Sequence, residues 1–536
     1  MALRDRRGAA LVLFVLLALA HTWPLVTAPA TLSRTDSADA LLNQWILGWV
    51  AHALVSQPLS LFHANIFFPE PRTLAFSEHL MVPALFSAPI FWIGGSPILA
   101  YNVTLWIGLA LTGWTTALVM HRWTGDWYAA LVAGSLAAFN TDTLTRMAHI
   151  QAMHVEFLPL ALRALDDVLQ RGGRRDALRL GAWAALQMLC SGYLLVMTAT
   201  ALGVAVLARV REWTGDRLRW RLPLLLGAAA MSLAICGPFL LQYYRVQHDQ
   251  GLTRSVDEVR LYSGVWQNFI ATGARLHFET WSASWYRAAN SAAFPGILPW
   301  LLALLAIGTG LAWRDARARM WLAIGVCGAA LSFGPALPGY ALLYDVMPIL
   351  QGIRAVARFA LLPLLAVGVL AAVGLAAIRV RLTASGHRRF AQVAGLVAVV
   401  GVNVENARAP MAFVRFEGIP AVYGALARED GAVVAELPFP EPARVAVNAV
   451  AVHASTRHWR PLLNGYSGYT PKSYVDHYLA FSSFPDPSAI DALRGAGVTH
   501  IVVHVDKAPD AVASLQRIDD VRLIAADTSR RIYRIK

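Results

Sequence analysis

Long apolar runs separated by short arginine-rich turns make up most of residues 1–404. Several runs approach the roughly 20 apolar residues that a helix needs to cross a bilayer. The basic turns lie at 4–7, 121–122, 171–175, 211–221, 314–319 and 379–389. Because basic turns between membrane spans stay in the cytoplasm, we place all six turns on that side.

The apolar runs between these turns pair into outgoing and returning spans. The predicted spans are 127–141 with 155–170, 177–190 with 193–210, 222–242 with 294–313, and 320–334 with 357–378. The first interval holds three runs, 8–28, 80–95 and 98–120. If all three crossed the membrane, the basic turn at 121–122 would lie outside and the orientation of everything after it would be inverted. Run 80–95 is short and is broken by prolines, so we predict a re-entrant or interfacial helix there. A last span near 390–404 brings the total to about eleven.

Composition changes after residue 404 to that of a soluble α/β segment. We predict strands at 431–437 and 498–503, a helix at 487–495, and a closing hairpin of 523–525 with 531–535. The expected fold is therefore mainly α: a polytopic helical membrane protein with a small C-terminal α/β domain. Its domains are a transmembrane domain at 1–404, whose first outer loop is 29–97, and an extracytoplasmic domain at 405–536.

Composition supports a multi-pass protein whose N-terminus is cytoplasmic and whose C-terminal domain is extracytoplasmic. Hydrophobic residues make up 57% of the chain and charged residues 15%, a balance that soluble domains rarely have. The net charge of +13 follows from the cytoplasmic turns, so we expect membrane lipids and no nucleic acid as partners. The cysteines Cys190, Cys236 and Cys327 lie in apolar runs and indicate neither disulfides nor a cysteine metal site.

Two carboxylates follow the first span directly, in the segment from Thr35 to Trp45. Asp36 and Asp39 lie three residues apart, near the amide of Asn43 and the indole of Trp45, both of which we predict to contact substrate. Acidic residues cost free energy near a bilayer, so this placement favours a functional role. The alternative is helix capping, because Ser37 and Asp39 both suit the N-cap of an amphipathic helix.

Other polar residues gather on the same predicted outer side. They are Glu78 and His79 of the first loop, Asp142, His149, Gln151, His154 and Glu156 of the next outer turn, and Tyr193 of the third. Convergence of several loops on one face is typical of an active site between helices. The alternative is that outer loops of any multispan protein are polar.

Metal binding by the second outer turn is tested by helix geometry. Asp142, His149 and Glu156 are spaced by seven, so on one helix neighbours would be roughly 10 Å apart, too far to share an ion. His149 and His154 would point to different faces. A divalent metal held jointly with the first loop remains open, and polar contacts to a phosphate or sugar are the preferred role of both histidines.

Two further pairs are candidate ligand contacts. Arg354 and Arg358, at the outer end of a span, could clamp a phosphate or diphosphate. The alternative is binding of lipid headgroups. Tyr466 and Tyr469, in the glycine-rich segment 464–471, could stack on a sugar ring, or could form a structural turn.

The order of these elements resembles the C-type (GT-C) membrane glycosyltransferases, in a bacterial branch. The matching segments are Asp39-x-x-x-Asn43-x-Trp45, Ser77-Glu78-His79, His149-x-Gln151, Ser191-Gly192-Tyr193 and Arg354 to Phe359. The resemblance implies a sugar donor on a polyprenyl phosphate, with Asp39, or secondly Asp36, as the catalytic base. Many members use a second acid after the third span, and here Asp142 or Glu156 would have to serve. A divalent metal ion is the one cofactor that the resemblance leaves open.

The leading hypothesis is an inverting glycosyltransferase in a bacterial inner membrane, acting on a lipid, glycan or protein acceptor at the outer face. A positioned carboxylate can deprotonate the attacking hydroxyl, and arginine or histidine can stabilise the leaving phosphate. The rivals are a lipid or glycan transporter (flippase) and a non-catalytic assembly protein. Against transport, the acids lie at span ends and the sequence has no inverted repeat of broken helices.

Overall fold

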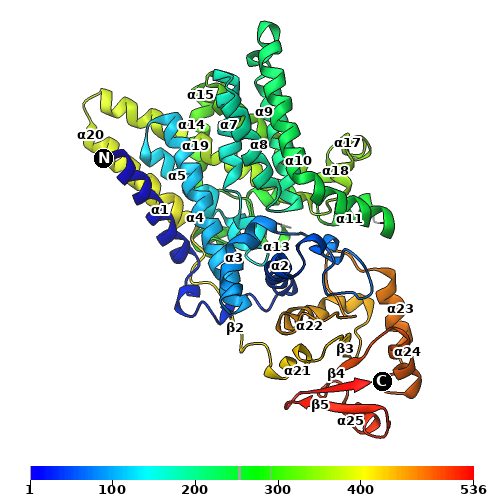
Figure 1. Cartoon of the computed structure of the whole chain (residues 1–536). Helices are drawn as coiled ribbons and strands as arrows, with labels where there is room; N and C mark the ends of the chain where they lie inside the picture. Colours follow the sequence, from blue (N-terminus) through cyan, green and yellow to red (C-terminus); the bar gives the residue numbers. More distant parts are fainter. Residues whose placement is uncertain (1, 252–254, 290, 536) are drawn as a thin grey trace. The chain divides into compact units, whose positions relative to one another are not determined.

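The computed structural model describes residues 2–251, 255–289 and 291–535 and is mainly helical (Figure 1). The chain packs into two compact units, each built from three stretches. Unit 1 comprises Met1–Ala28, Val103–Phe239 and Thr253–Ala412, and unit 2 comprises Pro29–Asn102, Leu240–Leu252 and Phe413–Lys536. Packing thus groups the predicted first outer loop with the C-terminal segment. The division of the chain at 404–405 stays a prediction.

Helices build unit 1, and each predicted span coincides with a helix or a helix pair. They are α1 (Ala2–His21), α4 (Pro97–Thr124, whose start belongs to unit 2), α5 (Trp127–Phe139), α7 (Phe157–Arg171), α8 (Arg174–Met188), α9 (Gly192–Ala208), α10 (Leu218–Gln250, whose end belongs to unit 2), α14 (Ile297–Gly308), α15 (Leu311–Arg314), α16 (Ala316–Ser332), α19 (Leu361–Ala384) and α20 (Arg388–Asn406). Short helices fill the longer connections: α6 (Thr141–Thr145), α11 (Val256–Leu261), α12 (Arg275–His277), α13 (Ala283–Ala288), α17 (Tyr340–Val346) and α18 (Pro348–Gln351).

Three helical stretches of the described residues are long and apolar enough to cross a membrane. They are Pro97–Thr124, Gly215–Gln250 and Val356–Ala384. Other predicted spans, such as α9 and α14, are shorter apolar helices. The total of about eleven spans therefore stays a prediction.

Helix α19 is the central element of unit 1 and packs against α5, α14, α16 and α20. Most of its first sixteen residues are buried. Close approaches occur at glycines of α16, where an ideal Cβ on Gly325 or Gly328 would lie 2.6 or 2.5 Å from the side chains of Ala366 or Leu362. Small residues at such crossings let membrane helices pack closely.

Ion pairs join the arginine-rich turns of unit 1. Arg209, just after α9, is 1% exposed and donates to Asp166 of α7 at 2.6 Å. Arg317 of α16 donates to the other carboxylate oxygen of Asp166 at 2.8 Å. Arg379 of α19 donates to Asp126, which precedes α5, at 2.6 Å. These contacts stabilise the helix ends at which the basic residues gather.

Two helices of the first outer loop contribute to unit 2. Helix α2 (Ala38–Ser56) is buried along most of its length, and packs against α3 (Met81–Trp92) and α22 (Ala449–Ala454). The 12 residues of α3 extend about 18 Å at 1.5 Å per residue, which is too short for a bilayer. Trp92 and Ile93 at its end are 54% and 85% exposed, as an interfacial helix requires.

The C-terminal segment is α/β, as predicted. Its sheet has the order β3–β4–β6–β5, in which β3 and β4 are parallel and the other neighbours are antiparallel. The elements are β3 (Val434–Leu437), β4 (His500–His504), β5 (Val521–Ala526), β6 (Arg530–Ile535), α21 (Gly424–Ala427), α23 (Lys472–Ala480), α24 (Pro487–Gly495) and α25 (Pro509–Leu515). A small antiparallel pair, β1 (Leu32–Ser33) with β2 (Val414–Arg415), completes unit 2.

Backbone hydrogen bonds join the first outer loop to the C-terminal segment within unit 2. The N–H of Phe68 donates to the carbonyl of Leu462 at 3.0 Å, and the N–H of Leu462 donates to the carbonyl of Asn65 at 2.7 Å. The Asn65 side chain accepts from the indole of Trp45 and donates to Ser455, both at 3.2 Å. Helix α2 is thereby held against the sheet domain.

Replacing Asp166 by alanine removes the shared partner of Arg209 and Arg317. Because an incompletely paired buried guanidinium is costly, we expect the free energy of unfolding to fall by about 3 kcal/mol. Thermal unfolding of the detergent-solubilised protein measures this as a lower Tm. Asp216→Ala, at an exposed carboxylate of the same region, is the control and should change stability by at most about 0.5 kcal/mol. Equal losses in both variants would contradict the role of the buried network.

Candidate active site

Asp39 lies in the first turn of α2, half-buried, and its Oδ1 accepts a hydrogen bond from the hydroxyl of Tyr466 at 2.7 Å. Ser37 occupies the N-cap position before α2 but makes no side-chain capping hydrogen bond. Capping alone does not account for Asp39, because its partner lies 427 residues away in the chain. The carboxylate is held by tertiary structure.

Asp36 has a different environment. It is exposed, and its two oxygens accept from Arg34 Nε at 3.0 Å and Nη2 at 3.3 Å. Arg34 and Asp36 lie in the same turn, so their ion pair forms without contacts from the rest of unit 2. The two carboxylates thus differ in their surroundings: Asp36 is paired within its own turn, whereas Asp39 is bound by a distant segment of the chain.

Asn43 and Trp45 support α2 around Asp39. The Asn43 amide donates to the backbone carbonyl of Asp39 at 2.7 Å. Trp45 is 1% exposed and its indole N–H donates to Asn65. Both residues were expected to contact substrate, and the structure places them in the packing of unit 2.

Glu78 and His79 precede α3. Glu78 is half-buried, and His79 is buried with Nδ1 accepting from the N–H of Met81 at 3.0 Å. Burial lowers the pKa of His79 to about 4, so its imidazole is neutral at pH 7. His79 thus fixes the start of α3, and the structure gives it no open face for a ligand.

The two tyrosines of segment 464–471 have separate partners in unit 2. Tyr466 donates to Asp39, whereas the Tyr469 hydroxyl lies 3.4 Å from the carbonyl of Gln250. The Tyr469 ring packs edge-on against Phe76, with centroids 5.4 Å apart. The segment is therefore more than a surface turn, and sugar stacking by either ring stays a prediction.

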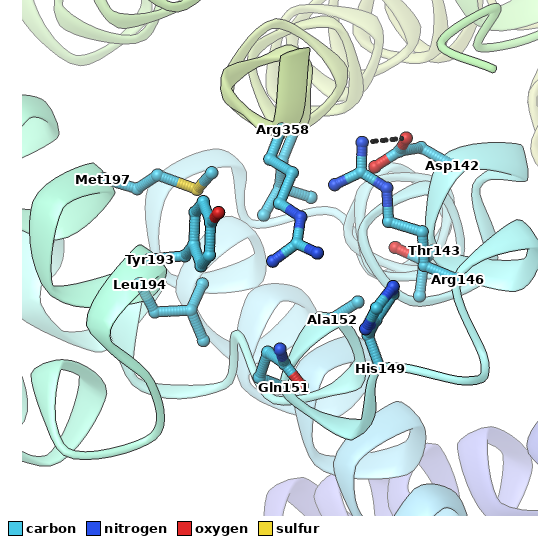
Figure 2. A pocket seen from close by; sticks show the side chains of 11 residues that line it. Asp142, Thr143, Arg146, His149, Gln151, Ala152, Tyr193, Leu194, Met197 and Arg358 are labelled. Carbon is cyan, nitrogen blue, oxygen red and sulfur yellow. Dashed lines mark ion pairs between the residues drawn. The ribbon is translucent and has the colours of Figure 1, made fainter. Parts of the chain in front are cut away.

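Unit 1 contains a cavity with an empty volume of about 370 Å³, open solvent included. Residues of the turn after α5, the start of α9 and the segment before α19 form it (Figure 2). The lining residues are Asp142, Thr143, Arg146, His149, Gln151, Ala152, Tyr193, Leu194, Met197, Arg358 and Leu361. Five of the predicted site residues are thus brought together: Asp142, His149, Gln151, Tyr193 and Arg358.

Arg358 is held in this cavity by an aromatic ring. Its guanidinium carbon lies 4.1 Å from the centroid of the Tyr193 ring, a cation–π contact. The Tyr193 hydroxyl accepts from the N–H of Ala355 at 3.3 Å, which fixes the ring. Figure 2 shows the guanidinium between Tyr193 on one side and His149 on the other.

A second guanidinium, that of Arg146, is paired with Asp142. Nη2 of Arg146 lies 3.0 Å from Oδ1 of Asp142, and Ser291 donates to the same oxygen at 2.6 Å (Figure 2). Burial lowers the pKa of Arg146, Asp142 raises it, and the like charge of Arg358 lowers it again. Arginine stays protonated in proteins nonetheless, so the cavity holds two positive charges.

One carboxylate faces these two guanidiniums, which leaves the cavity with an excess positive charge. His149 lines it half-buried, and Gln151 is 6% exposed. The side-chain oxygen of Gln151 has no hydrogen-bond partner within the described part of the chain. Such an arrangement suits an anion that also offers a donor, for example a phosphate ester with a sugar hydroxyl nearby.

His154 and Glu156 do not line the cavity, contrary to expectation. His154 is 0% exposed and Glu156 1% exposed, and Nδ1 of His154 lies 3.0 Å from Oε1 of Glu156. Gln187 of α8 donates to the carbonyl of His154 at 2.8 Å. The chain bends between α6 and α7, so this pair turns into the packing of unit 1, where it has a structural role.

Arg354 also departs from the predicted pair. Its Nη1 lies 3.5 Å from Oε1 of Glu258, and its guanidinium lies 5.0 Å from the Tyr262 centroid. The segment around Val356 is a 3-10 turn, so Arg354 and Arg358 do not share the helical face that their spacing predicted. Arg358 alone of this pair lines the cavity.

Asp142 and Glu156, the acids that the resemblance proposes as ligands of a divalent metal, do not fit that role. Asp142 is committed to Arg146 and Ser291, and Glu156 to His154. Residues 2–251, 255–289 and 291–535 contain no group of three or more His, Cys, Asp or Glu side chains that could hold a metal ion. Neither acid is therefore assigned to a metal.

Sequence reasoning missed two residues of this site. Arg146 lies four residues after Asp142, a helical spacing that predicts an ion pair and was a usable signal. Ser291 donates to Asp142 from 149 residues away, beyond what any local pattern indicates.

The sequence and the structure were compared with those of known proteins. Neither a protein-family model nor a curated protein matches the sequence. The arabinofuranosyltransferase AftD from Mycobacteria matches with a TM-score of 0.59 and 17% identity, over 99% of this chain and 40% of AftD. The oligosaccharyltransferase AglB from Archaeoglobus fulgidus, solved with an inhibitory peptide and a dolichol-phosphate, matches with a TM-score of 0.52 and 12% identity, over 96% of this chain and 71% of AglB.

The chain thus spans less than half the length of AftD. At such low identity a structural match establishes fold and not activity. The matches confirm the predicted resemblance at the level of architecture: the chain shares the fold of AftD and AglB.

Proposed function

We propose that the protein is an inverting glycosyltransferase that moves a sugar from a polyprenyl-phosphate donor to a lipid, glycan or protein acceptor. The observation that carries the proposal is the positively charged cavity of Arg146 and Arg358 within a GT-C fold. A cavity of this charge suits the phosphate of a lipid carrier. The dolichol-phosphate in the AglB structure is a ligand of the same chemical class.

The proposed location is the bacterial inner membrane, with the N-terminus in the cytoplasm and the C-terminal domain outside. Helix α9 runs from Tyr193 in the cavity to the ion pairs of Arg209, and α19 follows Arg358 and reaches Arg379 near its end. The 17 residues of α9 extend about 25 Å. The cavity and the basic turns thus lie at opposite ends of the same helices, and basic turns favour the cytoplasm.

Asp39 is the proposed general base. As the acceptor oxygen bonds to the anomeric carbon, its proton passes to the Asp39 carboxylate. The bond from the anomeric carbon to the phosphate oxygen breaks, and its electron pair leaves with the polyprenyl phosphate. Attack opposite the leaving group inverts the configuration at that carbon.

The cavity is proposed to stabilise the leaving phosphate. Arg358 presents a guanidinium that Tyr193 orients, and Arg146 adds a second charge that Asp142 holds in place. Charge that is fixed before the reaction stabilises a developing anion without reorganisation. The buried side-chain oxygen of Gln151, which has no partner among the described residues, is the proposed acceptor for a sugar hydroxyl.

Substituting Asp39 by asparagine should abolish sugar transfer, because the amide cannot accept the proton. General-base catalysis contributes about 10²–10⁴-fold to rate. We expect a deletion strain to lose one glycan or lipid modification, and Asp39→Asn to fail to restore it while wild type succeeds. Mass spectrometry of the cell-envelope glycans and lipids measures this.

Asp36→Asn is the matched carboxylate-to-amide change for that experiment, and the geometry predicts a much smaller effect. Full restoration by Asp39→Asn would contradict the proposed base and would favour the assembly-protein or transporter alternative. Equal expression of the variants in the membrane is the necessary control.

Substituting Arg358 by alanine should weaken binding of a polyprenyl phosphate, because a phosphate oxygen loses a charge-assisted donor. The expected loss of affinity is about 10- to 100-fold. Tryptophan fluorescence of the purified protein titrated with undecaprenyl phosphate measures it. Arg354→Ala, whose guanidinium pairs with Glu258, is the matched control. Wild-type affinity in Arg358→Ala, or an equal loss in both variants, would argue against the cavity as the phosphate site.

A further inference from the structure

We propose that Tyr466 is a positioning residue, through which the C-terminal sheet domain orients the carboxylate of Asp39. The proposal rests on the proposed function for its catalytic meaning. Its structural content, a hydrogen bond from the Tyr466 hydroxyl to one oxygen of the Asp39 carboxylate, stands on the geometry of unit 2.

The hydrogen bond itself is short and charge-assisted. The Tyr466 hydroxyl lies 2.7 Å from Oδ1 of Asp39, within the range of an O–H donor to a carboxylate. A phenol that donates to one oxygen restricts rotation of the carboxylate. The oxygen Oδ2 then keeps one direction, as a base that must meet an acceptor hydroxyl requires.

Two glycines allow the tyrosine segment, residues 464–471, to lie close against the first outer loop. An ideal Cβ on Gly468 would lie 2.8 Å from the carbonyl oxygen of Phe76, and one on Gly465 would overlap the ring of Phe67. A side chain at either position would push the segment away. The approach of Tyr466 to Asp39 thus depends on glycine at positions 465 and 468.

Asn464, the residue before Gly465, connects the tyrosine segment to the sheet. The Asn464 side chain accepts from the N–H of Glu436 at 2.7 Å and donates to the Glu436 carbonyl at 3.0 Å. Glu436 lies in β3, which is buried and paired with β4. Tyr466 is therefore anchored on a rigid element, which is the condition for precise orientation of a reacting group.

Asp39 is held from its own helix as well. Asn43 fixes the backbone carbonyl of Asp39, and Asn65 ties α2 to the C-terminal segment through Trp45 and Ser455. The helix and the tyrosine segment are thus parts of one packed body. The C-terminal domain completes the environment of the base and is more than a binding appendage.

Tyr466→Phe keeps the ring and removes the donor, so it tests the inference with little change in packing. For sugar transfer we expect kcat to fall about tenfold or more, with KM for the donor unchanged, because orientation and not binding is lost. A merely structural role would lower stability without lowering kcat at an unchanged KM.

A second measurement needs no activity. A water-soluble carbodiimide with an amine nucleophile labels carboxyl groups, and peptide mass spectrometry gives the labelling rates of Asp39 and Asp36 separately. Tyr466→Phe should label severalfold faster at Asp39 and at the wild-type rate at Asp36. Tyr469→Phe, which removes the neighbouring hydroxyl near Gln250, is the matched control and should leave the Asp39 rate unchanged.

The outcomes separate the two proposals. A wild-type labelling rate together with a wild-type kcat in Tyr466→Phe would overturn the positioning role. A faster kcat would also overturn it, because the phenol would then compete with the acceptor hydroxyl. If wild type transfers no sugar, or Asp39→Asn transfers it equally well, the proposed function fails, and the labelling rates still decide whether Tyr466 holds Asp39.

Discussion

The cost of placing charge in an apolar layer is the constraint on which this structure depends. The chain meets it by gathering its arginines in the turns at one end of the unit 1 helices, where Asp166 and Asp126 pair with them. The helices between these turns can then be almost wholly apolar and pack through small residues around α19. The charges of the cavity lie near the other ends of these helices, at the start of α9 and before α19.

The same constraint shapes the cavity. Arg146 is half-buried and is paired with Asp142, whereas Arg358 is stabilised by the face of Tyr193 instead of a carboxylate. This unequal pairing leaves a positive excess that an anion can neutralise. In unit 2, one oxygen of the Asp39 carboxylate accepts a hydrogen bond from the neutral hydroxyl of Tyr466. The positive cavity and this positioned carboxylate are the two features on which the proposed glycosyl transfer rests.

Local pattern predicted the elements well and their long-range contacts poorly. The helix expected at 487–495 is α24, and the strands, hairpin and most spans coincide with observed elements, because hydrophobic periodicity and basic turns are local signals. The grouping of the first outer loop with the C-terminal segment depends on contacts such as Tyr466 to Asp39, which no local pattern indicates.

The candidate site was predicted in part for the same reason. Asp142, His149, Gln151, Tyr193 and Arg358 do converge, since each lies at the predicted outer end of a helix. The roles of His154 and Arg354 could not be foreseen, because short bends after α6 and before α19 turn them toward Glu156 and Glu258. A spacing of four residues predicts a shared face only where the helix is continuous.

The most direct test of the central claim is release of the lipid carrier by the purified protein. The wild-type protein in lipid nanodiscs is incubated with polyprenyl-phosphate sugars and with membranes from the deletion strain as acceptor, and lipids are followed by mass spectrometry. The account predicts that one donor is converted to free polyprenyl phosphate while an equal amount of a glycosylated acceptor forms. Donors that stay intact, with a deletion strain whose envelope glycans equal those of the parent, would contradict it.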